Sequence, residues 1–289
     1  MKLKEHIEVS YDKDSRAYVF DFSQAKKVGK VTSRMFPILI GKNGFNGIGY
    51  GVLDRCGFLD SEPFDTYYTV RGAIGEYFVH EYVKEMYGKR GVEIETKTFE
   101  SMISYDGGKT FYGNDLFKKN ERFGGVVDIA IAKPVEARAV IEVKSKSAKD
   151  IEKIVTNGNY PDEEVLQGMQ LACLSKVDKL LMAYIFFSEI QEKNLKALMP
   201  TIENVNNFDI EELVKGLRWT AKDFDIHIKK FTVNLDEVQN DMDKAYENLH
   251  RNIKLGSIHE LHFTNNEIAY LDNLIRQKTG QPIEEDTPF

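Results

Sequence analysis

Cysteine is scarce in this sequence, and long apolar runs are missing altogether. The 289 residues include only Cys56 and Cys173, so the chain has no disulfide framework, no Cys-x-x-Cys pair and too few thiolates for an iron–sulfur cluster. No apolar run approaches the roughly 20 residues that a membrane-spanning helix needs. No apolar stretch follows the charges of residues 1–6, as it would in a secretory signal. We therefore expect a reducing, cytoplasmic setting without membrane partners.

The sequence also lacks a phosphate-binding loop of the form GxxxxGK[ST], so a role for ATP is not expected. An excess of positive charge is missing as well, because 39 Lys and Arg face 46 Asp and Glu and the formal net charge is −7. This balance argues against a protein that coats nucleic acid through many phosphate contacts. It does not exclude an enzyme that acts on nucleic acid, because net charge does not report the polarity of a single cleft.

The pattern of apolar positions predicts a mixed α/β chain. Strands are expected over 7–11, 17–22, 93–104, 126–132, 139–144, 180–187 and 224–233, and helices over 32–41, 69–87, 162–175, 209–217, 234–254 and 264–278. Six glycines between 41 and 66 predict a loop, and the stretch 145–160 is expected to be loosely structured. We expect residues 1–199 to form a core with a mixed central sheet flanked by helices, followed by a mostly helical appendage over 200–289.

Charged side chains inside two apolar strands are the most informative feature of the chain. The first strand carries Asp128 shortly after Gly124-Gly125, and the second carries Glu142 and Lys144. Residues i and i+2 of a strand lie on one face, so Glu142 and Lys144 point the same way. A buried carboxylate is costly unless a cation or a donor compensates it. The pattern therefore predicts that Asp128 and Glu142 share a divalent metal ion.

This arrangement is typical of metal-dependent phosphodiester hydrolysis. Mg²⁺ prefers a few carboxylates, a backbone carbonyl and several waters, which Asp128, Glu142 and the carbonyl of Val143 would provide. Lys144 would orient the attacking water or stabilise developing negative charge. The alternative is a surface ladder in which Glu142 and Lys144 face solvent, because Glu-x-Lys alone is common in strands.

The order of these elements resembles the PD-(D/E)xK nuclease superfamily, in particular its lambda-exonuclease/YqaJ/RecB-like branch, over roughly residues 30–190. The first long helix contains Gly72-Ala73-Ile74-Gly75-Glu76, which is similar to the family's Gly-x-x-x-Glu helix and makes Glu76 an outer carboxylate near the metal. The family also places a glutamine on the helix after the Glu-x-Lys strand. Gln167 fits that spacing better than Gln170, which lies one turn further on.

The resemblance also implies groups that contact DNA phosphates. Thr32-Ser33-Arg34 is similar to the Thr-x-Ser helix start of lambda-type exonucleases, which makes Ser33 and Arg34 expected phosphate contacts; a plain Ser/Thr helix cap is the alternative. Arg71 is another expected contact. Independently of the resemblance, Lys146 belongs with Lys149 and Lys153 to a basic rim that would follow the DNA backbone, which makes Lys146 a further expected contact. Asp150 and Glu152 interleave with this rim, and a solvated face is the alternative, which this mixture of charges favours.

The family suggests a Mg²⁺-dependent deoxyribonuclease, with Mn²⁺ as a substitute, acting as an exonuclease on linear double-stranded DNA ends during recombination or DNA processing in a phage or bacterium. By analogy it also suggests a homo-oligomer such as a trimer, and a single-strand annealing protein as partner. The alternatives are a structure- or site-specific endonuclease on the same core, a non-catalytic DNA-binding or assembly protein, and a small-molecule phosphohydrolase.

Overall fold

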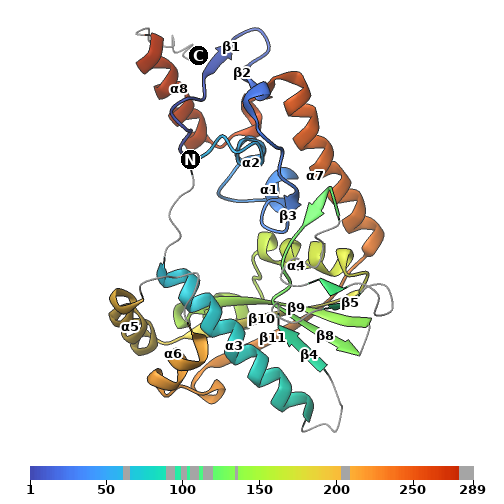
Figure 1. Cartoon of the computed structure of the whole chain (residues 1–289), viewed down its shortest axis with the longest axis vertical. Helices are drawn as coiled ribbons and strands as arrows, with labels where there is room; N and C mark the ends of the chain where they lie inside the picture. The colour runs from blue at the N-terminus through green and yellow to red at the C-terminus, as the bar shows by residue number, and fades with distance from the viewer. Residues whose placement is uncertain are drawn as a thin grey trace. The chain divides into compact units, whose positions relative to one another are not determined.

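The structure, a computed structural model, describes residues 1–60, 66–88, 95–98, 103–104, 111–112, 120–133, 136–202 and 209–279. The chain forms two compact units, drawn in Figure 1. Unit 1 comprises Met1–Ser61, Glu121–Phe123 and Asn240–Phe289, and unit 2 comprises Glu62–Asn120 and Gly124–Gln239.

Unit 2 is built on a five-stranded sheet with the order β11-β10-β9-β8-β4. The strands are β4 (Glu95–Thr98), β8 (Ile129–Lys133), β9 (Glu136–Ser147), β10 (Lys179–Phe187) and β11 (Asp225–Thr232). β9 and β10 run parallel, and the other neighbouring pairs are antiparallel. A parallel pair needs a crossover connection, and helix α4 (Asp162–Leu174) lies in the connection between β9 and β10. A separate short pair joins β5 (Ile103–Ser104) to β6 (Phe111–Tyr112).

Helices pack against both faces of this sheet (Figure 1). On one face, Ile185 and Phe187 of β10 join a buried cluster with Phe78 of α3 (Thr66–Gly88). The same cluster includes side chains from α5 (Glu189–Leu198) and α6 (Ile210–Leu217). On the other face, α4 comes so close that a Cβ added to Gly168 would lie 2.7 Å from Leu180 Cδ1. β10 is therefore covered on both sides, as its continuous apolar sequence predicts.

Unit 1 contains a three-stranded antiparallel sheet of β1 (Val9–Asp12), β2 (Ala17–Phe20) and β12 (Ser257–His259). Its helices are α1 (Phe36–Leu39), α2 (Ile48–Arg55) and α8 (Asn265–Thr279), and α7 (Leu235–Leu255) begins in unit 2 and ends in unit 1. β3 (Val31–Thr32) pairs with β7 (Phe123–Gly124). Tyr18 is 1% exposed in the core, where its hydroxyl donates to Asp272 Oδ1 over 2.8 Å.

The fold-class prediction, a mixed sheet flanked by helices, is confirmed. The compact units nevertheless do not divide at the expected boundary between 199 and 200. β11 pairs with β10 from Asp225 to Thr232, which ties that part of the expected appendage to the central sheet. β12 pairs with β2, which ties the C-terminal helices to the beginning of the chain.

Two local predictions in unit 1 are wrong. Residues 48–55 form helix α2 inside the predicted glycine loop. The glycines of this helix allow close packing rather than a loop, since a Cβ on Gly49 would lie 2.2 Å from Phe263 Cε1. The helix predicted over 32–41 shrinks to α1, because Thr32 belongs to β3 and the helix begins only at Phe36.

The stretch 145–160 has more structure than predicted. β9 continues to Ser147 and is followed by the 3₁₀ turn η2 (Ala148–Asp150) and the π-helical turn η3 (Glu152–Thr156). The remaining 3₁₀ turns are η1 (Phe22–Gln24), η4 (Met199–Thr201), η5 (Ala221–Asp223) and η6 (Glu260–His262). Residues 93–94 and 99–102 of the strand predicted over 93–104 lie outside the described residues.

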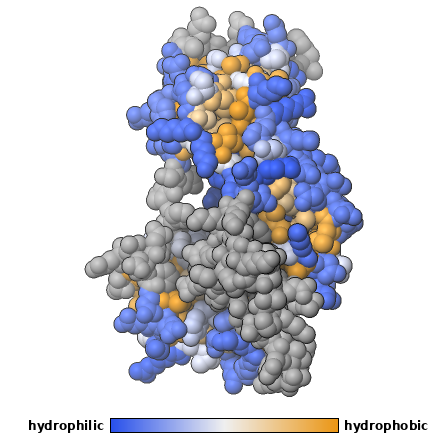
Figure 2. All heavy atoms as spheres, turned by 45° about the vertical axis from the view of Figure 1, so that its right-hand side comes forward, coloured by the Kyte–Doolittle hydropathy of each residue, from blue (hydrophilic) through white to orange (hydrophobic). Residues whose placement is uncertain are grey.

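The visible surface is mainly hydrophilic, with smaller apolar areas between charged side chains (Figure 2). Few large apolar side chains are strongly exposed in the described part of the chain, the most exposed being Phe45 and Leu261, both at 78%. None of the helices described combines the length and the apolar character that crossing a bilayer requires.

Candidate active site

The register between β8 and β9 places Asp128 beside Glu142. Strand β8 begins at Ile129, which pairs with Ile141, so Asp128 directly precedes the strand next to the part of β9 that carries Glu142. The charge of Glu142 acts on the carboxyl group of Asp128. Asp128 Oδ2 also accepts a hydrogen bond of 2.7 Å from the backbone N–H of Val143, which fixes its carboxylate against β9. The two acidic groups predicted from the sequence therefore do lie together.

Lys144 occupies the same face of β9 as Glu142 and joins this pair to helix α4. Its Nζ donates to Glu142 Oε1 over 2.8 Å and to Gln167 Oε1 over 2.8 Å. Burial lowers the pKa of Lys144, but Glu142 and further carboxylates outweigh this effect and raise it above its ordinary value. The ammonium group is therefore charged and held between two acceptors.

Glu76 of α3 completes the acidic cluster. Burial raises the pKa of Glu76 to about 7, and the charge of Glu142 adds to the rise while Lys144 opposes it. Burial likewise raises the pKa of Asp128 well above its ordinary value. The negative charges of Glu142 and Glu76 raise this pKa further. Three carboxyl groups thus crowd around one lysine, and they favour a cation or a proton among them.

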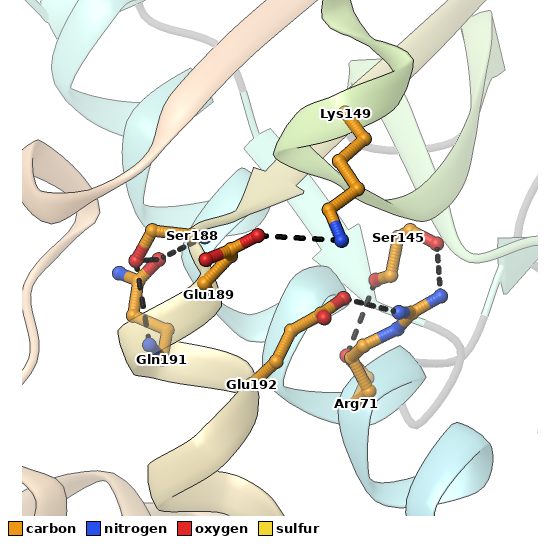
Figure 3. Close-up of polar contacts among 7 residues, drawn as sticks. All are labelled: Arg71, Ser145, Lys149, Ser188, Glu189, Gln191 and Glu192. Atoms are coloured by element: carbon orange, nitrogen blue, oxygen red, sulfur yellow. Dashed lines mark hydrogen bonds and ion pairs between the residues drawn. The ribbon is translucent and has the colours of Figure 1, made fainter.

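Figure 3 shows the polar contacts that connect α3 to β9. Arg71 donates from Nη2 to the carbonyl of Ser145 over 2.9 Å and from Nη1 to Glu192 Oε1 over 3.1 Å. In return, Ser145 Oγ donates to the carbonyl of Arg71 over 3.1 Å. Ser145 follows Lys144 directly, and the neighbouring Gly75 precedes Glu76. This reciprocal contact therefore sets the position of Glu76 relative to β9.

Gly75 is expected to tolerate no larger side chain. A Cβ at this position would lie 2.1 Å from Ser145 Oγ and 3.0 Å from Ile185 Cγ2, so Gly75→Ala must push α3 away from the sheet. We expect a loss of about 1–3 kcal/mol in the free energy of unfolding, measured by urea denaturation. Gly75→Ala/Ser145→Ala should recover part of that loss, because it removes the nearer clash. Gly72→Ala is the control, since nothing lies within 4 Å of a Cβ there. Equal effects at the two glycines would contradict the close contact.

The structure also locates the other residues predicted from the sequence. Ser33 and Arg34 belong to unit 1, whereas the acidic cluster belongs to unit 2. The alternative, a Ser/Thr helix cap, is wrong because α1 begins after Met35 without a side-chain cap. Arg71 is 13% exposed and bonds to protein groups, which favours a positioning role. Of the two candidate glutamines, Gln167 contacts Lys144, while Gln170 is fully buried.

Two neighbours of the site were not anticipated from the sequence. Glu164 pairs with Lys146, and Tyr184 stands beside Lys144 in the register of β9 and β10. Glu164 comes three residues before Gln167, one turn earlier on the same helix face, and this spacing is the signal that could have found it.

The donor set of the site fits a divalent cation held by few protein ligands. Glu142 Oε2 is buried without a hydrogen-bond partner, so this oxygen has a lone pair available to a metal ion. Among the described residues, no three His, Cys, Asp or Glu side chains are arranged to hold a metal ion. Mg²⁺ does not need such a cage, because it commonly takes one or two carboxylates and completes its shell with water and substrate.

The chain is similar in fold to solved structures, but its sequence matches neither a family profile nor a curated protein. The solved structures to which the chain is similar include exonucleases.

One of these is an alkaline exonuclease (LHK-Exo) from Laribacter hongkongensis, with 10% identity over 80% of this chain and 93% of that one, at a TM-score of 0.45. Its complex with dAMP gives 11% identity over 88% and 97%, at a TM-score of 0.43. A phage-related exonuclease from Haemophilus somnus 129PT gives 15% identity over 78% and 94%, at a TM-score of 0.41. These similarities are distant, so the chemistry of the site has to follow from its own residues.

Proposed function

We propose that this protein is a Mg²⁺-dependent nuclease that hydrolyses phosphodiester bonds of DNA, as an exonuclease on linear double-stranded ends. The observation that supports the proposal is a partly buried ammonium group fixed beside a cluster of carboxylates. Lys144 Nζ is held at 2.8 Å from both Glu142 and Gln167, and Asp128 Oδ2 accepts a hydrogen bond from the backbone N–H of Val143, the residue after Glu142. A purely structural ion pair would not need a third and a fourth acidic or polar group packed around it.

The residues that would hold the metal ion are Asp128 and Glu142, together with the backbone carbonyl of Val143. When bound, Mg²⁺ or Mn²⁺ supplies a more acidic water and neutralises charge on the scissile phosphate. Glu76 adds negative charge that favours binding of the cation.

The protein itself would contribute the ammonium group of Lys144, held in one position beside the reacting phosphate. The two hydrogen bonds to Glu142 and Gln167 hold the flexible side chain of Lys144 in one orientation, so little reorganisation is needed when charge develops on the phosphate. Lys144 would stabilise that charge or orient the attacking water. Asp128 is oriented in turn by the Val143 amide.

DNA hydrolysis can be tested directly with end-labelled linear DNA and closed circular DNA, each with Mg²⁺ or with EDTA. We expect Mg²⁺-dependent loss of the linear substrate and no cutting of the closed circle. Cutting of the circle would instead support an endonuclease. Binding without turnover would support a non-catalytic DNA-binding protein, and phosphate release from nucleotides alone would support a small-molecule phosphohydrolase.

A further inference from the structure

Strand β9 and helix α4 face each other through two successive polar contacts, and only the first belongs to the site described above. Glu142, Lys144 and Lys146 alternate along β9 and therefore lie on one face. Lys144 contacts Gln167, and Lys146 forms an ion pair with Glu164, one helical turn earlier on α4. The second contact thus repeats the geometry of the first, one step further along the strand.

The Lys146–Glu164 pair is sheltered but not sealed from solvent. The side chains are 22% and 15% exposed, and Glu164 Oε2 is buried without a hydrogen-bond partner. The phenol of Tyr184 interacts with Glu164, and the nearby carboxylate, after burial, raises the pKa of that phenol. The hydrogen-bonding capacity of the Glu164 carboxylate is therefore only partly used. The acceptor recorded for Lys146 is one oxygen of this carboxylate, and a stronger anion can replace it.

We infer that Lys146 is a second phosphate-binding group, held by Glu164 in the free protein and transferred to the backbone phosphate next to the scissile one when DNA binds. The inference rests on the proposed function and deepens it, because it makes an extended polynucleotide the preferred substrate. Residues i and i+2 of a strand lie about 6.5 Å apart, which is comparable with the separation of neighbouring phosphates along one DNA strand.

The local chemistry allows this transfer. A phosphate carries a full negative charge and several acceptor oxygens, so it competes well with one carboxylate for an ammonium group. When Lys146 turns away, Glu164 can accept a hydrogen bond from the neighbouring phenol of Tyr184, whose oxygen has no hydrogen-bond partner in the free protein. Glu164 is therefore a specificity-determining group: it reduces the affinity of Lys146 for isolated anions.

Binding of DNA without turnover tests the inference. Fluorescence anisotropy with a short labelled duplex in EDTA would compare wild type, Lys146→Met, Glu164→Gln and the double variant at several salt concentrations. We expect Lys146→Met to raise Kd roughly fivefold to tenfold and to reduce the slope of log K against log salt by about 0.9, the value for one lost phosphate contact. Glu164→Gln should lower Kd about threefold, because it frees Lys146. The double variant should match Lys146→Met.

The ion pair between Lys149 and Glu189 provides the matched control (Figure 3). Its side chains are 75% and 76% exposed, and its Nζ–Oε1 distance is 3.3 Å. Lys149→Met and Glu189→Gln should change Kd less than about twofold. The double variant Lys146→Met/Glu164→Gln removes both charges together, so it remains informative if Lys146→Met alone fails to fold with Glu164 unpaired.

A neutral methylphosphonate linkage then locates the contact. Placed next to the scissile phosphate, on either side in turn, it should weaken wild-type binding at one position and cause no further loss with Lys146→Met. The inference is overturned if Lys146→Met leaves Kd and the salt slope unchanged, or if Glu164→Gln has the same effect with and without Lys146. Cleavage of DNA by wild type in Mg²⁺ reports separately on the proposed function, so either idea can fail alone.

Discussion

Glu142→Gln is expected to lower the rate of DNA hydrolysis at least about 10³-fold while leaving the protein folded. The substitution removes a charged ligand for the proposed Mg²⁺ and one of the two acceptors that hold Lys144. It also reduces three crowded carboxyl groups to two around the same lysine, so the melting temperature should not fall. Single-turnover digestion of end-labelled duplex DNA measures the rate, and circular dichroism measures the melting temperature.

Lys144→Met is the companion to that experiment and should behave differently. It should lower the rate about 10²–10³-fold, and it should also destabilise the protein, because Glu142 and Asp128 lose their common counter-ion. Lys149→Met is the charge-matched control, since that side chain is 75% exposed and should change neither property. Undiminished digestion by Glu142→Gln would show that the assigned site is not the active site.

The site could be predicted from the sequence to the extent that strand periodicity determines it. Asp128, Glu142 and Lys144 are short-range features: two of them alternate on one strand, and the third precedes the antiparallel neighbour. Gln167 followed from the family resemblance, and its spacing to the next strand only favoured it over Gln170. The structure brings Lys144 into contact with both Glu142 and Gln167.

Other features depend on packing between segments that no local rule connects. The contact of Gly75 with Ser145 depends on how closely α3 approaches β9. Helix spacing places Glu164 on the face of Gln167, but its pairing with Lys146 depends on the orientation of α4 across the sheet, which the sequence does not reveal. β12 is only three residues long and pairs with β2 from the other end of the chain, so its own sequence gives no sufficient signal.

For helix α2 the helix propensity of glycine predicted the wrong structure, because tertiary packing outweighs this propensity. Glycine disfavours helix by about 1 kcal/mol per residue, and this penalty predicted a loop. The ring of Phe263 occupies the space that a side chain at Gly49 would need, so only glycine lets α2 pack there. The packing gained outweighs the lower helix propensity of the segment.

The metal-free protein is expected to lose stability as the pH rises from about 4.5 to about 7. Glu76 has a pKa of about 7 in the folded protein against 4.5 for the free side chain. Between these values the folded state keeps a proton that the unfolded state has lost, so the free energy of unfolding falls with rising pH. The loss from Glu76 is on the order of 3 kcal/mol once the pH exceeds 7. It is fully recovered below pH 4.5, where both states are protonated.

Glu76→Gln isolates this effect, because an amide does not titrate. In EDTA, the variant should be more stable than wild type at pH 8 by on the order of 2–3 kcal/mol, and the difference should vanish near pH 4.5. Urea denaturation at several pH values measures it, with Glu81→Gln as the control on the same helix, where the carboxylate is 48% exposed. Mg²⁺ should raise the stability of wild type at pH 8 more than that of the variant, because the ion offsets the same crowded charge. If the free energy of unfolding changed with pH in the same way for wild type and Glu76→Gln, the raised pKa of Glu76 would not be the cause of the pH dependence. The expected profile would show that the crowded carboxylates that favour cation binding lower the stability of the metal-free protein at neutral pH.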